Sequence, residues 1–154
     1  MADAKIVRNG DGEVYEHFWK FKHGSLTGGK FDFMVGSIDY LAGPPLHVHD
    51  EQDDTFFVLE GVLAVQVGDD VHDLGPGDFA TVPPGVPHTF DNIRKDQPPV
   101  KVCNLMTPGG LDRQFRDMSE MAGTVADPAD AVRLRKKHGI THVGPTLGKK
   151  LGLC

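Results

Sequence analysis

The chain has 154 residues, of which 39% are hydrophobic and 25% are charged, and its formal net charge at pH 7 is -6. This length suits one domain with a substantial core. The negative charge excludes non-specific nucleic-acid binding, which needs an excess of Lys and Arg, and no apolar run approaches the roughly 20 residues that span a bilayer. With no apolar signal region in MADAKIVRNGDGEVYEH and only two cysteines, we expect a cytoplasmic protein with free thiols.

Short strands are predicted for the first two thirds of the chain, where many of the 19 Gly and 11 Pro mark turns. Glu13 to Phe21 mixes aromatic and polar residues, and we expect one strand there at a sheet edge. Lys30 to Leu41 alternates in hydropathy. Seven further strand segments each close with a turn residue: PPLHVH, TFFVLEG, VLAVQVGDD, VHDL, DFATVPPG, PHTFDN and PPVKVCNLMTP. This pattern predicts an all-β sandwich or barrel.

Beyond Pro108 the apolar residues follow helical spacing, as in GGLDRQFRDMSEMAG. A second helix is predicted after Asp127, a suitable N-cap, with Pro128 at the first helical position, Gly139 just past the end and basic residues in the last turns. We expect both helices to cover the β body and GKKLGLC to be a loose end. The predicted organisation is an edge segment over 1–30, a barrel core over 31–108, and helices and tail over 109–154 on the same domain.

A pair of histidines gives the first indication of chemistry. Side chains at positions i and i+2 of a strand face the same way, so His47 and His49 in PPLHVH point together and can reach one metal ion. The pair alone is weak, because the chain has eight histidines. A third candidate is His88, which follows the rigid Pro83-Pro84-Gly85 turn at the start of another strand. An antiparallel barrel would bring such a strand to the same ion.

These residues resemble the two motifs of the cupin superfamily. The second motif is Gly, five residues, Pro, one, Gly, two, His, three, Asn, and it is matched throughout by Gly77, Pro83, Gly85, His88 and Asn92. The first motif is Gly, five residues, His-x-His, three or four, Glu, six, Gly. It is matched by His47, His49 and Gly61; its first glycine falls at Leu41, with Gly43 two residues later, and its glutamate falls at Asp54.

The resemblance covers about Asp32 to Pro108 and implies a double-stranded β-helix, the cupin jelly-roll barrel, with a metal in its mouth. The ligands it implies are His47, His49, Asp54 and His88, with Asp54 also as general base. The small single-domain, quercetin dioxygenase-like cupins are the narrower resemblance. The implied cofactor is one divalent transition metal ion, Fe, Mn, Ni or Co, with Zn or Cu as alternatives, because N and O ligands without thiolate suit these ions.

Other residues have simpler interpretations. Asp53 and Glu51 rival Asp54 as ligands, but alternation and the spacing to Gly61 favour Asp54, and Asp50 is a solvated loop residue. Asn92 supports its turn, and Cys103 is a buried small residue. Surface or structural roles are expected for His17, His23, His72, His138 and His142. Core positions are expected for Phe56, Phe57, Leu59, Leu63, Val65 and Val67.

Three functions fit this combination. The first is a metal-dependent dioxygenase that acts on an aromatic or enolisable small molecule. The second is a non-oxidative isomerase, cyclase or lyase of polyketide type using the same ion. The third is a small-molecule-binding cupin with little turnover, since fold does not fix function. We also expect a homodimer that pairs through sheet edges, with Glu13 to Phe21 at the contact, and no membrane or nucleic-acid partner.

Overall fold

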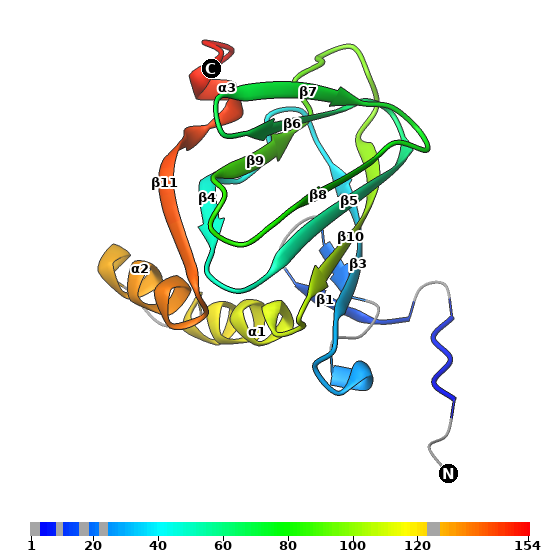
Figure 1. The fold of residues 1–154 in the computed structure, drawn as a ribbon, viewed down its shortest axis with the longest axis vertical. Coiled ribbons are helices and arrows are strands. Elements are labelled where there is room, and N and C mark those ends of the chain that lie inside the picture. The colour runs from blue at the N-terminus through cyan, green and yellow to red at the C-terminus, as the bar shows by residue number, and fades with distance from the viewer. Residues whose placement is uncertain (1–3, 9–10, 16–18, 22–24, 123–126) are drawn as a thin grey trace.

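The computed structural model describes residues 4–8, 11–15, 19–21, 25–122 and 127–154. Two antiparallel sheets face each other, as Figure 1 shows. The six-stranded sheet has the order β1 (Glu13–Tyr15), β2 (Trp19–Phe21), β3 (Asp32–Ile38), β10 (Val100–Thr107), β5 (Asp53–Glu60) and β8 (Phe79–Val82). The five-stranded sheet has the order β11 (Ile140–Thr146), β4 (Pro45–His49), β9 (His88–Asp91), β6 (Leu63–Val67) and β7 (Asp70–Leu74).

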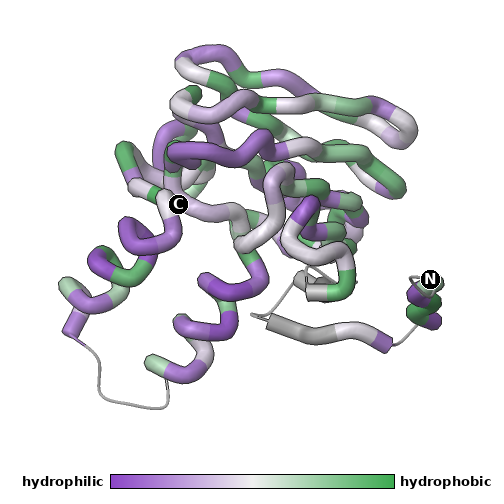
Figure 2. The backbone as a smooth tube through the Cα atoms, turned by 60° about the horizontal axis from the view of Figure 1, so that its bottom comes forward, coloured by the Kyte–Doolittle hydropathy of each residue, from purple (hydrophilic) through white to green (hydrophobic). Residues whose placement is uncertain are grey.

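The remaining elements are short helices. A 3-10 turn, η1 (Ser25–Thr27), precedes β3, and α3 (Leu147–Lys150) ends the chain. Helices α1 (Leu111–Ala122) and α2 (Pro128–Lys137) lie side by side at one end of the barrel (Figure 1). Figure 2 shows hydrophilic residues along much of both helices, and alternating hydropathy along the strands. None of the helices in the described ranges is long and apolar enough to cross a membrane.

Strand alternation builds the core between the sheets. The six-stranded sheet contributes Met34, Ile38, Phe56, Val58, Val100, Val102 and Met106, and the other sheet contributes Leu63, Val65, Phe90 and Ile140. Helix α1 adds Leu111 and Phe115 to the same cluster. Burying this apolar surface is the main favourable contribution to folding. The predicted all-β class with short C-terminal helices is confirmed.

Three expectations need correction. Glu13 to Phe21 does not form one strand: β1 and β2 pair antiparallel, with Glu13 opposite Phe21, and residues 16–18 lie outside the described residues. Phe57 and Leu59 are not core residues, because β5 alternates and places them on the outer face, each 41% exposed.

The third correction concerns the C-terminus, where residues Ile140–Thr146 form the unforeseen strand β11, paired with β4. The first residue of the segment GKKLGLC is packed against the domain, so the segment is not a loose end there. Its Gly148 is buried in α3 beside the fully buried Leu147, and the backbone N–H of Leu153 donates to Gly148 O at 2.9 Å.

Helix α1 is held at its start by a side chain distant in sequence. Oδ2 of the buried Asp32, in β3, accepts hydrogen bonds from the backbone N–H groups of Gly110 (2.8 Å), Leu111 (2.6 Å) and Asp112 (3.4 Å). The first N–H groups of a helix have no partner within it, so this carboxylate caps α1 from the neighbouring sheet. The contact fixes α1 against the barrel mouth.

The second helix begins and ends as predicted. The side chain of Asp127 accepts a hydrogen bond from Ala129 N at 2.9 Å, Pro128 occupies the first turn, and Gly139 after the helix has a φ of +72°.

The loop around Asn92 also agrees with its predicted supporting role. The Asn92 amide donates to Ile38 O at 3.3 Å and its oxygen accepts from Gln97 Nε2 at 2.6 Å.

Candidate metal centre

The two histidines of β4 face the interior. In this strand His47 and His49 are buried while the intervening Val48 is only half-buried, as the period of two in a strand requires. Their rings meet edge to face, with centroids 5.0 Å apart. The sequence pair His-x-His therefore presents two imidazoles to one point inside the barrel.

The Pro83-Pro84-Gly85 turn delivers His88 to the same point. Gly85 has a φ of +78°, a conformation that favours glycine, and its N–H donates to His49 O at 2.8 Å. This bond ties the turn to β4. His88, at the start of β9, then lies directly opposite His47 in the antiparallel pair, with ring centroids 4.5 Å apart.

Asp54 reaches the histidines from the opposite sheet. Its Oδ2 lies 3.1 Å from His88 Nε2 and 3.6 Å from His49 Nε2. Each of His47, His49, Asp54 and His88 is buried, and each offers one donor atom such that all four atoms lie within 4.8 Å of one another. The structure thus brings together all four residues that the motif resemblance implied.

The hydrogen bonds behind the rings leave the inner nitrogens available to a cation. Nδ1 of His47 lies 2.9 Å from Pro45 O, and Nδ1 of His88 lies 2.9 Å from Val86 O. A carbonyl oxygen only accepts, so each Nδ1 carries a proton and a neutral ring has its lone pair on Nε2. Nδ1 of His49 is buried without a partner among the described residues. Three imidazole nitrogens and a carboxylate oxygen fit a divalent transition metal.

The electrostatics of the cluster indicate what a cation would replace. Burial alone would raise the pKa of Asp54, but the neighbouring His49 and the hydrogen bond from His88 hold it well below its usual range. Burial would lower the pKa of His88, yet the bond to Asp54 and its charge raise it overall. Burial lowers the pKa of His47 to about 3, with help from the neighbouring histidines. Because the pKa of His88 is raised and that of Asp54 is lowered, a proton on His88 would compete with a metal for this centre.

Asn104, on β10, is a member of the site that sequence reasoning missed. Its Nδ2 donates to Asp54 Oδ1 at 2.5 Å and to Thr55 O at 3.1 Å. Val100, Val102, Asn104 and Met106 share the buried face of β10. A lone polar residue on an apolar strand face needs a buried partner, and that signal was present in PPVKVCNLMTP.

A cavity of about 300 Å³ opens onto the cluster. Its walls include His47, His49, Asp54 and Asn104, together with apolar side chains such as Phe90, Leu111, Phe115, Met118 and Ile140. Three further polar residues of the helical extension also line it: Gln114, Arg135 and His142.

No feature of the sequence places Gln114, Arg135 and His142 near the histidines. The spacing of Gln114 and Arg135 on their helices does not reveal which neighbour the helices pack against. His142, read as a surface or structural histidine, is exposed but lies at the cavity because β11 pairs with β4, placing it opposite His47. Partial burial and the positive charge of Arg135 lower the pKa of His142.

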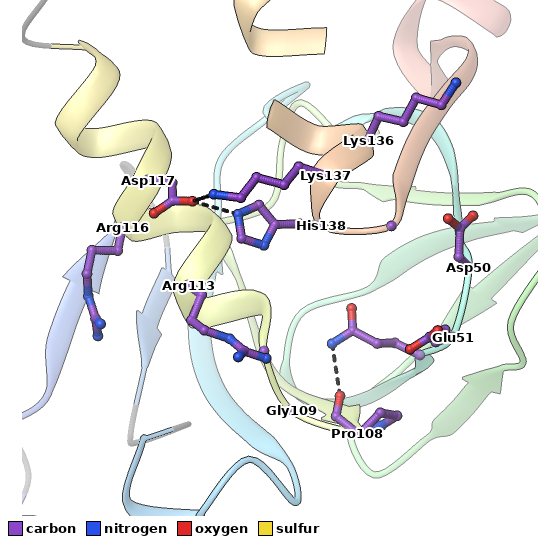
Figure 3. Close-up of a pocket in the computed structure, with 13 residues that line it drawn as sticks. Asp50, Glu51, Pro108, Gly109, Arg113, Arg116, Asp117, Lys136, Lys137 and His138 are labelled. Carbon is purple, nitrogen blue, oxygen red and sulfur yellow. Dashed lines mark hydrogen bonds and ion pairs between the residues drawn. The ribbon is translucent and has the colours of Figure 1, made fainter. Parts of the chain in front are cut away.

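A second, larger cavity of about 730 Å³ lies between α1, the end of α2 and the loop after β4 (Figure 3). It holds none of the four clustered residues. Its cations are partly neutralised within it, since Lys137 and His138 contact Asp117 Oδ2 at 3.1 and 2.8 Å. Glu51, the alternative ligand, lines this cavity and does not join the cluster, and the loop residue Asp50 also lines it.

The other histidines hold simpler positions. His138 is half-buried against Asp117, a structural role, and His72 is exposed on β7. His17 and His23 lie outside the described residues. Asp53 is half-buried at the start of β5, where alternation turns it away from Asp54.

Leu41 stands where the first motif has a glycine, and its backbone has an unusual conformation for a leucine. Leu41 has a φ of +57°, in the left-handed region where glycine is favoured, and it occupies the place of the motif glycine. Its N–H donates to Asn92 O at 2.9 Å, which links the two motifs. The backbone shape is therefore kept although the residue type is not.

Comparison with known proteins agrees with this geometry. Residues 38–106 match the family model described as Cupin domain. Over 89 residues the chain is 30% identical to quercetin 2,3-dioxygenase from Bacillus subtilis, a match that covers 55% of this chain and only 26% of that protein. The chain therefore corresponds to about a quarter of that relative's length.

Two solved structures illustrate the fold. A sugar phosphate isomerase of the cupin superfamily from Silicibacter pomeroyi is 27% identical with a TM-score of 0.51, covering 58% of this chain and 57% of that one. A protein with a double-stranded β-helix domain from Klebsiella pneumoniae is 20% identical with a TM-score of 0.56, covering 70% of this chain and 93% of that one. The two facing sheets, the motif residues and these matches together show that residues 38–106 of this chain are a cupin domain.

Proposed function

We propose that this protein is a metal-dependent dioxygenase that acts on an aromatic or enolisable small molecule. The observation that carries the proposal is the convergence of His47, His49, Asp54 and His88 on one point at the wall of an apolar cavity. The partial identity with quercetin 2,3-dioxygenase supports the oxidative chemistry. The cavity volume, near the lower end of the roughly 300–1,000 Å³ of small-molecule sites, favours a compact substrate.

The four clustered residues would hold one divalent ion, with Fe, Mn, Ni or Co as our assignment and Zn or Cu as alternatives. Such an ion supplies Lewis acidity toward a substrate oxygen and, if redox-active, the electronic means to use O2. No further protein ligand is provided by the described residues, so positions remain for exogenous ligands. This is the arrangement of a catalytic rather than a closed structural site.

The protein's own groups perform three tasks in this proposal. Asp54 accepts the proton of a substrate hydroxyl or enolisable carbon at Oδ2, while Asn104 holds Oδ1 in place. The low pKa of Asp54 keeps it ionised at neutral pH and makes it a weak base. It is therefore best suited to accept a proton from a substrate hydroxyl that is already acidic. The apolar walls formed by Phe90, Leu111 and Phe115 exclude water from the reacting groups.

A non-oxidative isomerase, cyclase or lyase is the second candidate. The likeness to a sugar phosphate isomerase favours it, because that structure shares 27% identity with this chain. Asp54 is a methylene shorter than the glutamate of the motif, and this change suits either a modified proton transfer or a protein that binds without turnover. In each case the same four residues hold the ion.

Oxygen dependence separates these functions. The purified protein is depleted of metal, loaded separately with Fe(II), Mn(II), Ni(II), Co(II) and Zn(II), and analysed for bound metal. Oxygen consumption with quercetin and with acetylacetone is followed by electrode, and the same mixtures are assayed under argon. We expect substrate-dependent oxygen uptake with a redox-active ion and none for His49→Ala. Turnover under argon would favour the second candidate, and stoichiometric binding without turnover would favour a binding protein.

A further inference from the structure

Arg135 is a half-buried cation on the wall of the histidine cavity. Two other cations of α2 are paired: Arg133 contacts Asp130, and Lys137 contacts Asp117 at 3.1 Å. Within the described part of the chain no carboxylate forms an ion pair with Arg135. A guanidinium that is withdrawn from water is normally paired, so this one is suited to an anionic ligand.

Gln114, on α1, presents a second unsatisfied group to the same cavity. It is 5% exposed, its Oε1 is buried without a partner among the described residues, and its Nε2 contacts Met118 Sδ at 3.6 Å, a weak acceptor. Rotation of the amide presents either its oxygen or its NH2 group to a ligand. A buried polar group of this kind requires an explanation, and a bound polar ligand provides one.

His142 completes the polar side of the cavity. It lies on β11 opposite His47, and Arg135 is close enough for its charge to act on His142. Helices α1 and α2 and strand β11 therefore bring an arginine, an amide and an imidazole to one cavity that also holds the metal-binding cluster. None of the three is needed to hold an ion, because the four clustered residues suffice.

We infer that Arg135, with Gln114 and His142, binds the carboxylate of a small acidic substrate whose other oxygen lies at the metal. This inference rests on the proposed function, because it names the substrate class of that site. The charges agree with it: a divalent ion beside Asp54 retains one positive charge, and Arg135 adds another. A coordinated oxyanion and one carboxylate balance these two charges, whereas a phosphate dianion would leave excess negative charge. The planar guanidinium fork also matches a carboxylate.

The test compares an acid with its amide. Binding of 3-hydroxybenzoate, 3-hydroxybenzamide and 3-hydroxyphenyl phosphate is measured by calorimetry on Zn-loaded and metal-free protein. We expect the benzoate to bind more tightly than the amide, and Arg135→Gln to weaken benzoate binding about ten- to a hundredfold while leaving amide binding unchanged. Arg133→Gln, an exposed change on the same helix, is the matched control and should alter neither.

The outcomes separate this inference from the proposed function. A wild-type protein that binds no metal would contradict the metal centre. The carboxylate site would still be supported if the metal-free protein binds the benzoate more tightly than the amide and Arg135→Gln removes that preference. Equal binding of acid and amide, no wild-type binding of the acid, or equal loss in Arg135→Gln and Arg133→Gln would overturn the inference. Tighter binding of the phosphate than of the benzoate would overturn the assignment to carboxylates.

Discussion

Asn104 donates a hydrogen bond of 2.5 Å to Oδ1 of Asp54, and both side chains are buried on adjacent strands β10 and β5. The bond leaves Oδ2 as the carboxylate oxygen that faces the histidines. Asp54 is short for its motif position, so the angle of its carboxylate depends on this partner. Asn104 acts through Asp54 and is therefore a positioning residue.

Replacing Asn104 tests this role. We expect Asn104→Leu, which preserves side-chain size, to weaken metal binding about ten- to a hundredfold, because Asp54 loses the bond that orients it. Competition with a chromophoric chelator measures the affinity. Cys103→Ser is the control, since Cys103 is the adjacent residue on the other face of β10. Equal affinity of wild type and Asn104→Leu would show that Asp54 does not depend on Asn104.

The histidine ligands make a second prediction. His49→Ala and His88→Ala should each reduce bound metal to a small fraction of the wild-type content, because each removes one of the three imidazole ligands of the cluster. The circular dichroism of the β barrel should persist, since the sheets are built from other residues. His72→Ala, at an exposed position of β7, should retain full metal content by elemental analysis. Retention of metal by both cluster variants would refute the ligand assignment.

The local pattern of the sequence predicted the strands of the barrel core, and the motif resemblance implied the four-residue cluster. Each strand carries its own alternation and turn residues, and the motif spacing encodes the relation between His47, His49 and His88. What could not be predicted depends on contacts between distant segments. In the sequence, the segment of β11 looks like part of the tail, because its strand forms only by pairing with the distant β4. Helical spacing identified Arg135 as a last-turn cation, but only the packing of α2 shows that it lines the cavity.

The raised pKa of His88 beside Asp54 predicts opposite pH trends for stability and metal binding. The pKa of His88 in the folded protein is raised above its ordinary value of 6.5, so its contribution to the free energy of unfolding is complete below pH 6.5 and is lost as pH rises through the folded pKa. His47 remains neutral throughout, because its pKa is about 3. Metal affinity should increase about tenfold per pH unit over the same range and then level off.

Thermal unfolding of the metal-free protein and metal titrations at successive pH values measure both trends. In Asp54→Asn, His88 loses the charge that raises its pKa, so we expect the affinity to reach its plateau at a lower pH, although the affinity itself is smaller. An affinity that does not vary between pH 6 and pH 8 in the wild type would contradict a raised pKa of His88.

The cap between Asp32 and α1 predicts a link between stability and ligand binding. Asp32→Ala leaves the first N–H groups of α1 without an acceptor, and we expect it to lower the free energy of unfolding by about 2 kcal/mol. Hydrogen exchange over 111–122 should accelerate. Because Gln114 and Phe115 line the cavity from α1, ligand binding should weaken as well. Asp39→Ala, an exposed acidic residue just after the same strand, is the control. Unchanged exchange in α1 would refute the capping role.

We propose a homodimer that forms through the outer face of the six-stranded sheet near its edge strand β8, and not through the expected contact at Glu13 to Phe21. Phe33, Phe57 and Phe79 are 37%, 41% and 61% exposed, and Phe57 lies directly opposite Phe79 in the β5–β8 pair. Neighbouring exposed aromatics of this kind favour association. We expect light scattering to give the mass of a dimer at micromolar concentration, and Phe79→Lys, at the most exposed of the three, to give a monomer with unchanged metal content. Thr141→Lys, at an exposed position of β11 in the other sheet, controls for added charge. A monomeric wild type would exclude the dimer.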